Sequence, residues 1–230
     1  MENENSDFLT FRSGMTNIYL LPFEENYILI DTGVKKREPA FFAFLNRHDI
    51  VPDKIDYIFL THTHYDHTGG ISLIKEMSHA KIMVHTKEAG YLRQGFTPVP
   101  RGSRASTKVV AFLGRHFFKN LNRYTPTEPD IVWEDEPYHP EPFPAQAIHT
   151  PGHTSGSSTL IWKEKMAFVG DTLFGIEKED CFPWFVNDTE TLGKSWEKLL
   201  DSSCEMFYPA HGKPVTRARL ERSYRKHFRS

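Results

Sequence analysis

Three histidines and one aspartate fall within six residues, from His62 to His67, and this run constrains the chain more than any other feature. It lies inside Thr61–Gly70 and follows the apolar stretch Ile55–Leu60. Imidazole and carboxylate groups bind first-row divalent metals, so a metal site is predicted at the end of a buried strand. A solvated loop or a purification tag is the alternative. A tag is a homopolymer at a terminus, however, whereas this run is internal, mixed in composition and followed by two glycines.

Four other short motifs also end apolar stretches with a histidine or an aspartate. They are Ile30–Gly33, Ile148–Thr154, Phe168–Thr172 and Tyr208–Gly212, which carry Asp31, His153, Asp171 and His211. A lone histidine in such a place is usually structural, but five strand-end loops of this kind are much less probable by chance. Strand-end loops converge on one edge of a fold, where binding sites form. The five loops are therefore predicted to build one site.

The order of apolar segments predicts an α/β fold. Strands are expected at residues 8–11, 17–22, 27–30, 55–60, 81–84, 130–133, 146–150, 158–162, 166–169 and 206–208. Helices are expected at residues 38–47, in the segment that carries Ile71 to Met77, from 188 or 189 to 200, and at 218–228. Asp66 or Thr68 is expected to cap the second of these helices. Strand, ligand loop and helix recur in each half, which favours a four-layer αββα sandwich, and 230 residues suit a single domain over 1–230.

Composition is that of an ordinary globular protein, with 39% hydrophobic and 25% charged residues and a net charge of -2. The opening residues are acidic and resemble no signal peptide, and no apolar stretch reaches the roughly 18 residues of a membrane span. The two cysteines form no disulfide framework or metal motif. A cytoplasmic protein with no transmembrane segment is therefore expected. The basic end of the last helix suits the helix dipole better than nucleic-acid binding, so no nucleic-acid partner is expected.

The motifs resemble those of the metallo-β-lactamase superfamily. The resemblance rests on His-x-His-x-Asp-His followed by Gly-His, Gly-Asp-Thr and Ala-His-Gly, and it extends from Asp31 to Gly212. It implies two divalent metal ions, expected to be zinc, with iron or manganese as alternatives. The first metal would be held by His62, His64 and His153, the second by Asp66, His67 and His211, and Asp171 would bridge them. Asp31 would orient the ligand loop without ligating a metal.

This ligand set predicts hydrolysis by a metal-bridging hydroxide. Two divalent cations bring a charge of +4, and Asp66, Asp171 and the hydroxide leave about +1, which lowers the pKa of bound water toward roughly 7. Asp66 and Asp171 are the candidate catalytic residues, and no nucleophilic serine or cysteine is needed. The expected substrate bond is an ester, a thioester or a lactone. A phosphodiester hydrolase, an iron-dependent persulfide dioxygenase-like oxidoreductase and a low-turnover, metal-stabilised effector protein are the alternatives.

Branches of the superfamily differ at positions that this chain reveals. The bridging aspartate, Asp171, is absent from the zinc β-lactamases of the family, which argues against β-lactam hydrolysis. The flavin-linked reductases have glutamate in place of His64, and the homoserine-lactone lactonases have tyrosine near the position of Phe174. Residues 170–174 instead resemble the glyoxalase II-like branch. Because the chain ends one helix after His211, the glutathione specificity of that branch is not carried over.

The segment from Tyr91 to Thr125 is expected to set the substrate. It holds seven lysines or arginines and no acidic residue. Apolar residues recur every four positions from Val109 to Leu121, which predicts a helix, with Ser106 as its N-cap. The helix could pack on the sandwich, cover the metal site as a lid that selects a small anionic substrate, or contact a membrane surface or a second subunit in a homodimer. The candidate pocket residues are Arg101, Arg104, Arg115, Phe117, Phe174 and Trp184, although Trp184 could equally be core.

Overall fold

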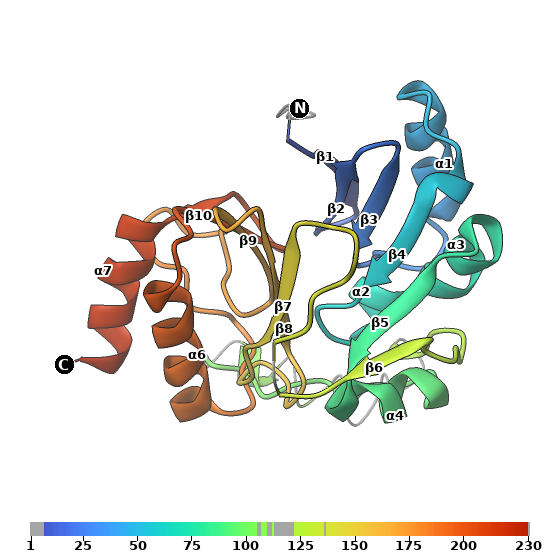
Figure 1. Cartoon of the computed structure of the whole chain (residues 1–230). Helices are drawn as coiled ribbons and strands as arrows, with labels where there is room; N and C mark the ends of the chain where they lie inside the picture. The colour runs from blue at the N-terminus through green and yellow to red at the C-terminus, as the bar shows by residue number, and fades with distance from the viewer. Residues whose placement is uncertain (1–6, 105–106, 110–111, 113–121, 136, 230) are drawn as a thin grey trace. The chain divides into compact units, whose positions relative to one another are not determined.

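The computed structural model of the chain describes residues 7–104, 107–109, 112, 122–135 and 137–229. The described residues form two sheets with helices, and chain contacts divide the protein into two compact units. The first unit comprises residues 1–97 and 120–133, and the second comprises residues 98–119 and 134–230. Each sheet belongs to one unit (Figure 1). The expectation of one domain over 1–230 stays a prediction.

The first unit is built on a six-stranded sheet with its strands in chain order. The strands are β1 (Leu9–Ser13), β2 (Thr16–Phe23), β3 (Asn26–Ile30), β4 (Ile55–Phe59), β5 (Lys81–His85) and β6 (Ile131–Trp133). The β1–β2–β3 part is antiparallel because two-residue turns join its strands, with positive φ at Gly14 and Glu24. The β3–β4–β5–β6 part is parallel, so its strands end at the same edge. Asp31 and the histidine run both follow strands that end there.

The first unit contains both helices that the sequence predicts for it, and further helical segments besides. They are α1 (Glu38–Arg47), the 3-10 turn η1 (Pro52–Lys54), α2 (Tyr65–Thr68), α3 (Ile71–Ser78) and α4 (Thr86–Gln94). In the core, Phe41 and Phe44 of α1 pack on Phe11 of β1, with ring centroids 5.5 and 5.4 Å apart. The capping prediction for α3 is wrong. Gly70 precedes α3 without a side-chain cap, because Asp66 and Thr68 belong to the short helix α2.

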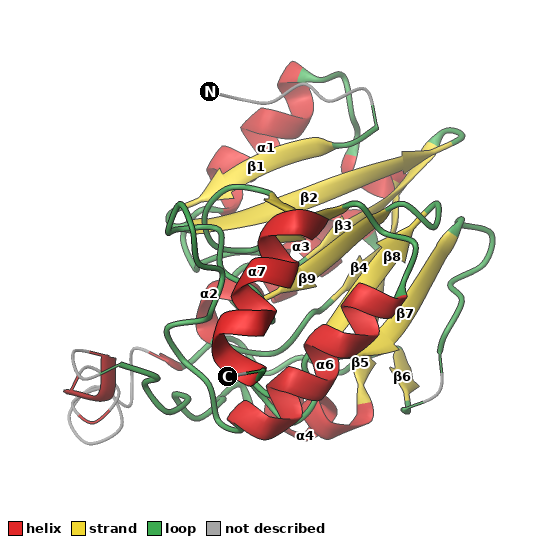
Figure 2. Ribbon diagram, turned by 90° about the vertical axis from the view of Figure 1, so that its left-hand side faces the viewer, coloured by secondary structure: helices red, strands yellow, loops and turns green. Residues whose placement is uncertain are grey.

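The second unit contains a five-stranded sheet in the order β11-β10-β9-β8-β7. Its strands are β7 (Ala145–His149), β8 (Ser158–Trp162), β9 (Met166–Gly170), β10 (Met206–Pro209) and β11 (Val215–Thr216). The helix α6 (Thr189–Asp201) connects the parallel strands β9 and β10, and α7 (Arg217–Phe228) follows β11. The two helices lie side by side (Figures 1 and 2). As predicted, α6 begins after Asp188, whose carboxylate accepts a hydrogen bond from the backbone of Thr191 at 3.0 Å.

The basic segment 91–125 is divided between the two units. It begins in α4, while residues 98–104 belong to the second unit, where Gly102 forms a bridge with Phe185. The predicted cap Ser106 and the pocket candidates Arg115 and Phe117 lie outside the described residues. Val109 is helical and 58% exposed, and the other three positions of the predicted stripe lie outside the described residues, so the three alternatives for this helix stay open. No helix among the described residues is long and apolar enough to cross a membrane.

Candidate metal-ligand loops

Asp31 fixes the histidine run of the first unit from the end of β3. It is 1% exposed and has a φ of 60°, a left-handed conformation that aspartate tolerates better than most residues. Its carboxylate accepts hydrogen bonds from the backbone N–H and hydroxyl of Thr61, at 2.9 and 2.8 Å. It also accepts one from Nδ1 of His67 at 2.8 Å. The hydrogen bond at Nδ1 leaves Nε2 as the ring atom of His67 that would ligate a metal. Orienting a ligand in this way, without ligating the metal itself, is the role predicted for Asp31.

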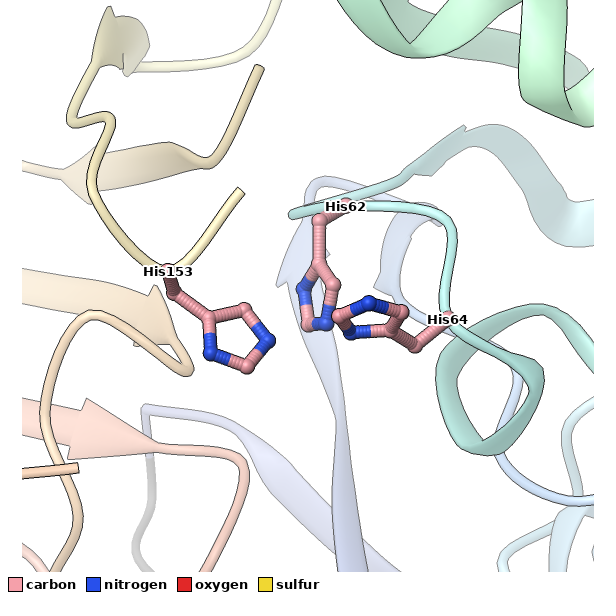
Figure 3. Close-up of side chains that lie close together, drawn as sticks. All are labelled: His62, His64 and His153. Carbon is pink, nitrogen blue, oxygen red and sulfur yellow. The ribbon is translucent and has the colours of Figure 1, made fainter. Parts of the chain in front are cut away.

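The three histidines of the run lie together at the end of β4. The ring of His62 is 4.6 Å from that of His64 and 3.9 Å from that of His67, measured between centroids. Figure 3 shows His62 and His64 leaving the same loop of the first unit, and His153 on a turn of the second unit. Asp66 lies in α2, where its carboxylate is 3.9 Å from Nε2 of His67 and accepts a long hydrogen bond from Thr16 at 3.4 Å. The side chains of this run therefore lie near one another, while their assignment to two metals stays a prediction.

A buried polar network holds the histidine loop from behind. Glu88 of α4 is 0% exposed and accepts hydrogen bonds from the backbone and the hydroxyl of Thr63, at 3.0 and 2.5 Å. The hydroxyl of Thr97 donates to the carbonyl of Thr63 at 2.6 Å and lies 3.0 Å from the hydroxyl of Tyr124. Burial raises the pKa of Tyr124 to about 12, so this phenol stays protonated. The network fixes the backbone between His62 and His64.

Glycines let the loop after β3 close against the histidine run. A Cβ atom on Gly69 would lie 2.2 Å from the backbone nitrogen of Lys35, a distance that real side chains do not reach. The N–H of Gly69 donates to the carbonyl of Gly33 at 2.8 Å, and the N–H of Thr32 donates to the carbonyl of His67 at 2.7 Å. The Asp31–Gly33 loop therefore fixes both the side chain and the backbone of the histidine run.

His153 of the second unit is held by a loop far along the chain. Its Nδ1 atom lies 2.8 Å from the carbonyl oxygen of Phe185, which can only accept, so Nδ1 donates and Nε2 is the atom that would ligate a metal. Gly152, with a φ of 135°, brings the turn against α6. A Cβ atom there would lie 2.6 Å from the Cα of Leu192. Close backbone packing on α6 thus fixes the position of His153.

Asp171, directly after β9, contacts the other two histidine-bearing loops of the second unit. Its Oδ2 atom lies 3.4 Å from Nε2 of His153, and its Oδ1 atom lies 3.4 Å from Nε2 of His211. Both distances exceed the roughly 2.7–2.9 Å of a charge-assisted hydrogen bond. They match the separation of about 3.4 Å between two ligands on a tetrahedral zinc with bonds of about 2.1 Å. The donor set therefore fits divalent metal ions, with each oxygen of Asp171 directed to a different histidine.

An aromatic wall adjoins His211. The ring of Phe174 lies 5.0 Å from that of His211, and Trp184 lies 6.2 Å beyond Phe174. The guanidinium of Arg104 is 5.9 Å from the Trp184 ring and forms an ion pair with Glu177. Three of the predicted pocket residues, Phe174, Trp184 and Arg104, are thus together in the second unit. Arg101 contacts this part of the second unit through its backbone, because its carbonyl accepts a hydrogen bond from the N–H of Val186. Its side chain is exposed.

Two residues that support these loops have no counterpart in the sequence predictions. Glu88 lies in α4, a helix whose polar composition gives a weak periodic pattern. Glu177 lies in a charged stretch of 177–180 that reads as solvated surface. Both residues lie in segments without a motif or a clear hydrophobic period, which is why the sequence did not indicate either of them.

The two sheets, together with the loops rich in histidine and aspartate, define an α/β metalloprotein. Histidine and aspartate side chains in these loops form groups that could hold a metal ion. The sequence model of the metallo-beta-lactamase superfamily matches residues 12–211, and the chain belongs to this superfamily. Membership implies divalent metal ions and a metallo-hydrolase. The family resemblance predicted from the motifs is confirmed.

Relatives in this superfamily carry several functional names. The chain is 30% identical to "Beta-lactamase-like protein 2 homolog" of Drosophila melanogaster, over 87% of this chain and 59% of the fly protein. It is 25% identical to "Probable metallo-hydrolase YflN" of Bacillus subtilis, over 88% of this chain and 82% of that protein. It is 27% identical to "Atrochrysone carboxyl ACP thioesterase" of Aspergillus fumigatus, over 86% of this chain and 50% of that protein. The chain thus spans less than two thirds of the fly and fungal proteins.

Solved structures confirm the predicted fold class. The B3 metallo-beta-lactamase BLEG-1 matches with a TM-score of 0.72 at 24% identity, covering 92% of this chain and 95% of that one. BJP-1, a subclass B3 enzyme of Bradyrhizobium japonicum, matches with a TM-score of 0.70 at 16% identity, covering 96% and 88%. Identities this low support the metallo-β-lactamase-like α/β fold alone.

Proposed function

We propose that the protein is a dinuclear metal-dependent hydrolase of carboxylic esters, thioesters or lactones. The observation that carries the proposal is the carboxylate of Asp171, whose two oxygens face His153 and His211 at 3.4 Å each. A carboxylate directed to two separate histidines is suited to bridge two cations, one on each oxygen. A single-metal site would not require this arrangement.

The proposed ligands are the residues implied by the family resemblance. The first metal is assigned to His62, His64 and His153, the second to Asp66, His67 and His211, and Asp171 to both. Hydrogen bonds at Nδ1 support the assignment of His67 and His153, because each leaves Nε2 as the ligating atom. Zinc is the preferred metal for a site of imidazoles and carboxylates, with iron or manganese accepted by the same donors.

Two bound divalent cations would lower the pKa of a coordinated water and polarise the substrate's carbonyl oxygen. The residues of the chain supply orientation and charge. Asp31 holds His67 in the tautomer with a proton on Nδ1, and the Phe185 carbonyl does the same for His153. The carboxylates of Asp66 and Asp171 offset part of the positive charge, and Asp66 is held near Thr16. These roles need no nucleophilic serine or cysteine.

Among the substrate classes of this proposal, a thioester is supported by the name of one relative. One relative, half of whose length this chain covers, is named as an acyl-carrier-protein thioesterase. Both cysteines are buried, and burial raises the pKa of Cys181 to about 12, which makes this thiol a poor nucleophile. Hydrolysis without a covalent intermediate on a thiol is consistent with that environment.

The test combines metal analysis with a substrate panel. We expect about two metal ions per chain in freshly purified protein, and turnover of at least one ester, thioester or lactone. His153→Ala should lower kcat/KM by more than about a hundredfold, while the exposed control His139→Ala should not. One metal per chain, or turnover confined to a phosphodiester or a persulfide, would contradict the proposal. Full activity in His153→Ala would do so as well.

A further inference from the structure

Glu177 is held firmly on the side of the aromatic wall. Its backbone carbonyl accepts a hydrogen bond from the guanidinium of Arg219 in α7, which also donates to the carbonyl of Asp180 at 3.0 Å. Asp180 is in turn bonded to Ser223 and Lys226 at 2.7 Å each. The backbone at Glu177 is therefore fixed from α7.

The Glu177 carboxylate contacts two residues of the predicted substrate pocket through a single oxygen. Oε1 accepts a hydrogen bond from the indole N–H of Trp184 at 3.2 Å and forms the ion pair with Arg104. The side chains of Arg104 and Glu177 are 39% and 37% exposed, so this pair lies at the rim of the wall and not in the core. Bonding to Arg104 lowers the pKa of Glu177, which keeps it ionised at neutral pH.

The segment that carries Arg104 is tied to the segment that carries Trp184. The N–H of Ser103 donates to the carbonyl of Trp184 at 2.9 Å, and the hydroxyl of Ser103 donates to the carbonyl of Pro183 at 2.7 Å. The position of Arg104 beside Trp184 is therefore set by the backbone as well as by Glu177. The aromatic wall thus runs from His211 through Phe174 and Trp184 to a rim where a cation and an anion cancel.

We infer that Glu177 is a specificity-determining residue, which neutralises Arg104 so that the wall of Phe174 and Trp184 prefers uncharged acyl groups over carboxylate-bearing ones. This inference rests on the proposed function. It reverses the expectation of an anionic substrate at Arg104, because a carboxylate would meet a paired guanidinium and a neighbouring carboxylate. An unpaired arginine would be required to favour an anion there.

The test uses two acyl groups of equal length, hexanoyl and adipoyl, each as the thioester of the same small thiol. Their free acids, hexanoate and adipate, serve as ligands in calorimetric titrations of the metal-loaded protein. The wild-type protein should prefer the hexanoyl thioester in kcat/KM and hexanoate in Kd. Glu177→Gln should shift both ratios toward the dicarboxylic member by about three- to tenfold, as expected for one partly solvated charge. Arg104→Gln should shift them in the opposite direction.

Two controls separate charge from loss of structure. The double variant with Glu177→Gln and Arg104→Gln should return both ratios to the wild-type values, because the rim is again neutral. Glu179→Gln changes the same charge two residues away, on a side chain that is 71% exposed, and should leave the ratios unchanged. The shift in Glu177→Gln should also shrink at high salt, since partly exposed charges are screened.

The outcomes distinguish this inference from the proposed function. Equal losses for both acyl groups in Glu177→Gln would overturn the inference, since they indicate a purely structural role. A wild-type protein that binds neither acid, or that prefers adipate, would overturn it too. Binding ratios that shift as expected in a protein without turnover would uphold the role of Glu177 in selection and contradict only the hydrolase proposal.

Discussion

The carboxylate of Asp31 accepts a hydrogen bond from Nδ1 of His67 at 2.8 Å, with both side chains at most 1% exposed. The two residues are 36 positions apart: Asp31 directly follows β3, whereas His67 lies in α2. The contact decides which nitrogen of His67 carries the proton and where its ring points. Asp31 also binds Thr61, so the same carboxylate sets both the beginning and the end of the histidine run.

Replacing Asp31 by asparagine should therefore weaken metal binding. The amide cannot accept from Thr61 and His67 with both of its side-chain atoms, so the ligand loop loses orientation. Loss of such a partner costs about 10- to 100-fold in metal affinity. The Kd for zinc, measured by competition with a chelator, should rise by that factor. Asp49→Asn is the matched control, because Asp49 also has a positive φ, 56°, but is exposed. Equal affinities in the two variants would exclude the positioning role of Asp31.

Thr63→Val tests the buried network behind the loop. Valine has nearly the shape of threonine but removes the hydroxyl that donates to Glu88 at 2.5 Å, leaving a buried carboxylate with one donor fewer. The free energy of unfolding should fall by about 1–3 kcal/mol. Urea denaturation measures this change. Thr127→Val removes a solvent-exposed hydroxyl hydrogen bond and should change the stability by less than about 0.5 kcal/mol. Similar losses of unfolding free energy in the two variants would mean that the hydrogen bond from Thr63 to Glu88 stabilises the protein no more than an exposed one does.

Gly152→Ala should damage the His153 turn. The φ of 135° is unfavourable for alanine, and the added Cβ would lie 2.6 Å from the Cα of Leu192. Because α6 or the turn must move, the free energy of unfolding should fall by more than about 2 kcal/mol, and metal binding should weaken. Gly90→Ala makes the same substitution within α4, where nothing lies within 4 Å of the new Cβ. This control should be stabilised by up to about 1 kcal/mol. A Gly152→Ala variant with the stability and metal affinity of the wild-type protein would contradict the close packing of this turn on α6.

Some elements were predictable because local chemistry alone specifies them. The bounds of α1, Glu38–Arg47, were predicted without error, since Pro39 marks its first turn and its phenylalanines recur on one face. The ligand loops were predictable for a similar reason, because polar side chains appear where apolar strands end. In contrast, α4 was missed. Among its residues only Glu88, Ala89 and Leu92 are buried, which is too few for a clear helical period.

Contacts between distant segments could not be predicted from the pattern. The seven basic residues of 91–125 suggested a positive rim, yet Arg104 pairs with Glu177, which lies 73 positions away. A count of charges along one segment does not reveal which of them are balanced by another. The lysine and histidine near the end of α7 show the same limit. They were assigned to the helix dipole, but Lys226 and His227 also bind Asp180.

Asp180 should make the stability of the protein depend on pH. Burial raises the pKa of this carboxyl group, but hydrogen bonds from Lys226, Ser223 and His227 outweigh burial and hold the pKa well below its ordinary value. A carboxyl group with a lowered pKa in the folded state stabilises the protein above its unfolded pKa, near 3.9, and this contribution is lost as the pH falls toward the folded value.

Asp180→Asn should therefore lower the free energy of unfolding by about 2 kcal/mol near pH 7, where the native carboxylate is ionised and paired. The difference from the wild-type protein should narrow as the pH falls below about 4, since the wild-type protein then loses the same interaction. Urea denaturation at a series of pH values measures this difference. Because both proteins have the same metal-ligating residues, the pH dependence that these residues cause cancels in the difference between the two unfolding free energies. Asp201→Asn, an exposed change in α6, should show no such pH-dependent difference. A stability difference between Asp180→Asn and wild type that stays constant from neutral pH to about pH 2 would mean that the ionised carboxylate is not what Lys226 and His227 hold.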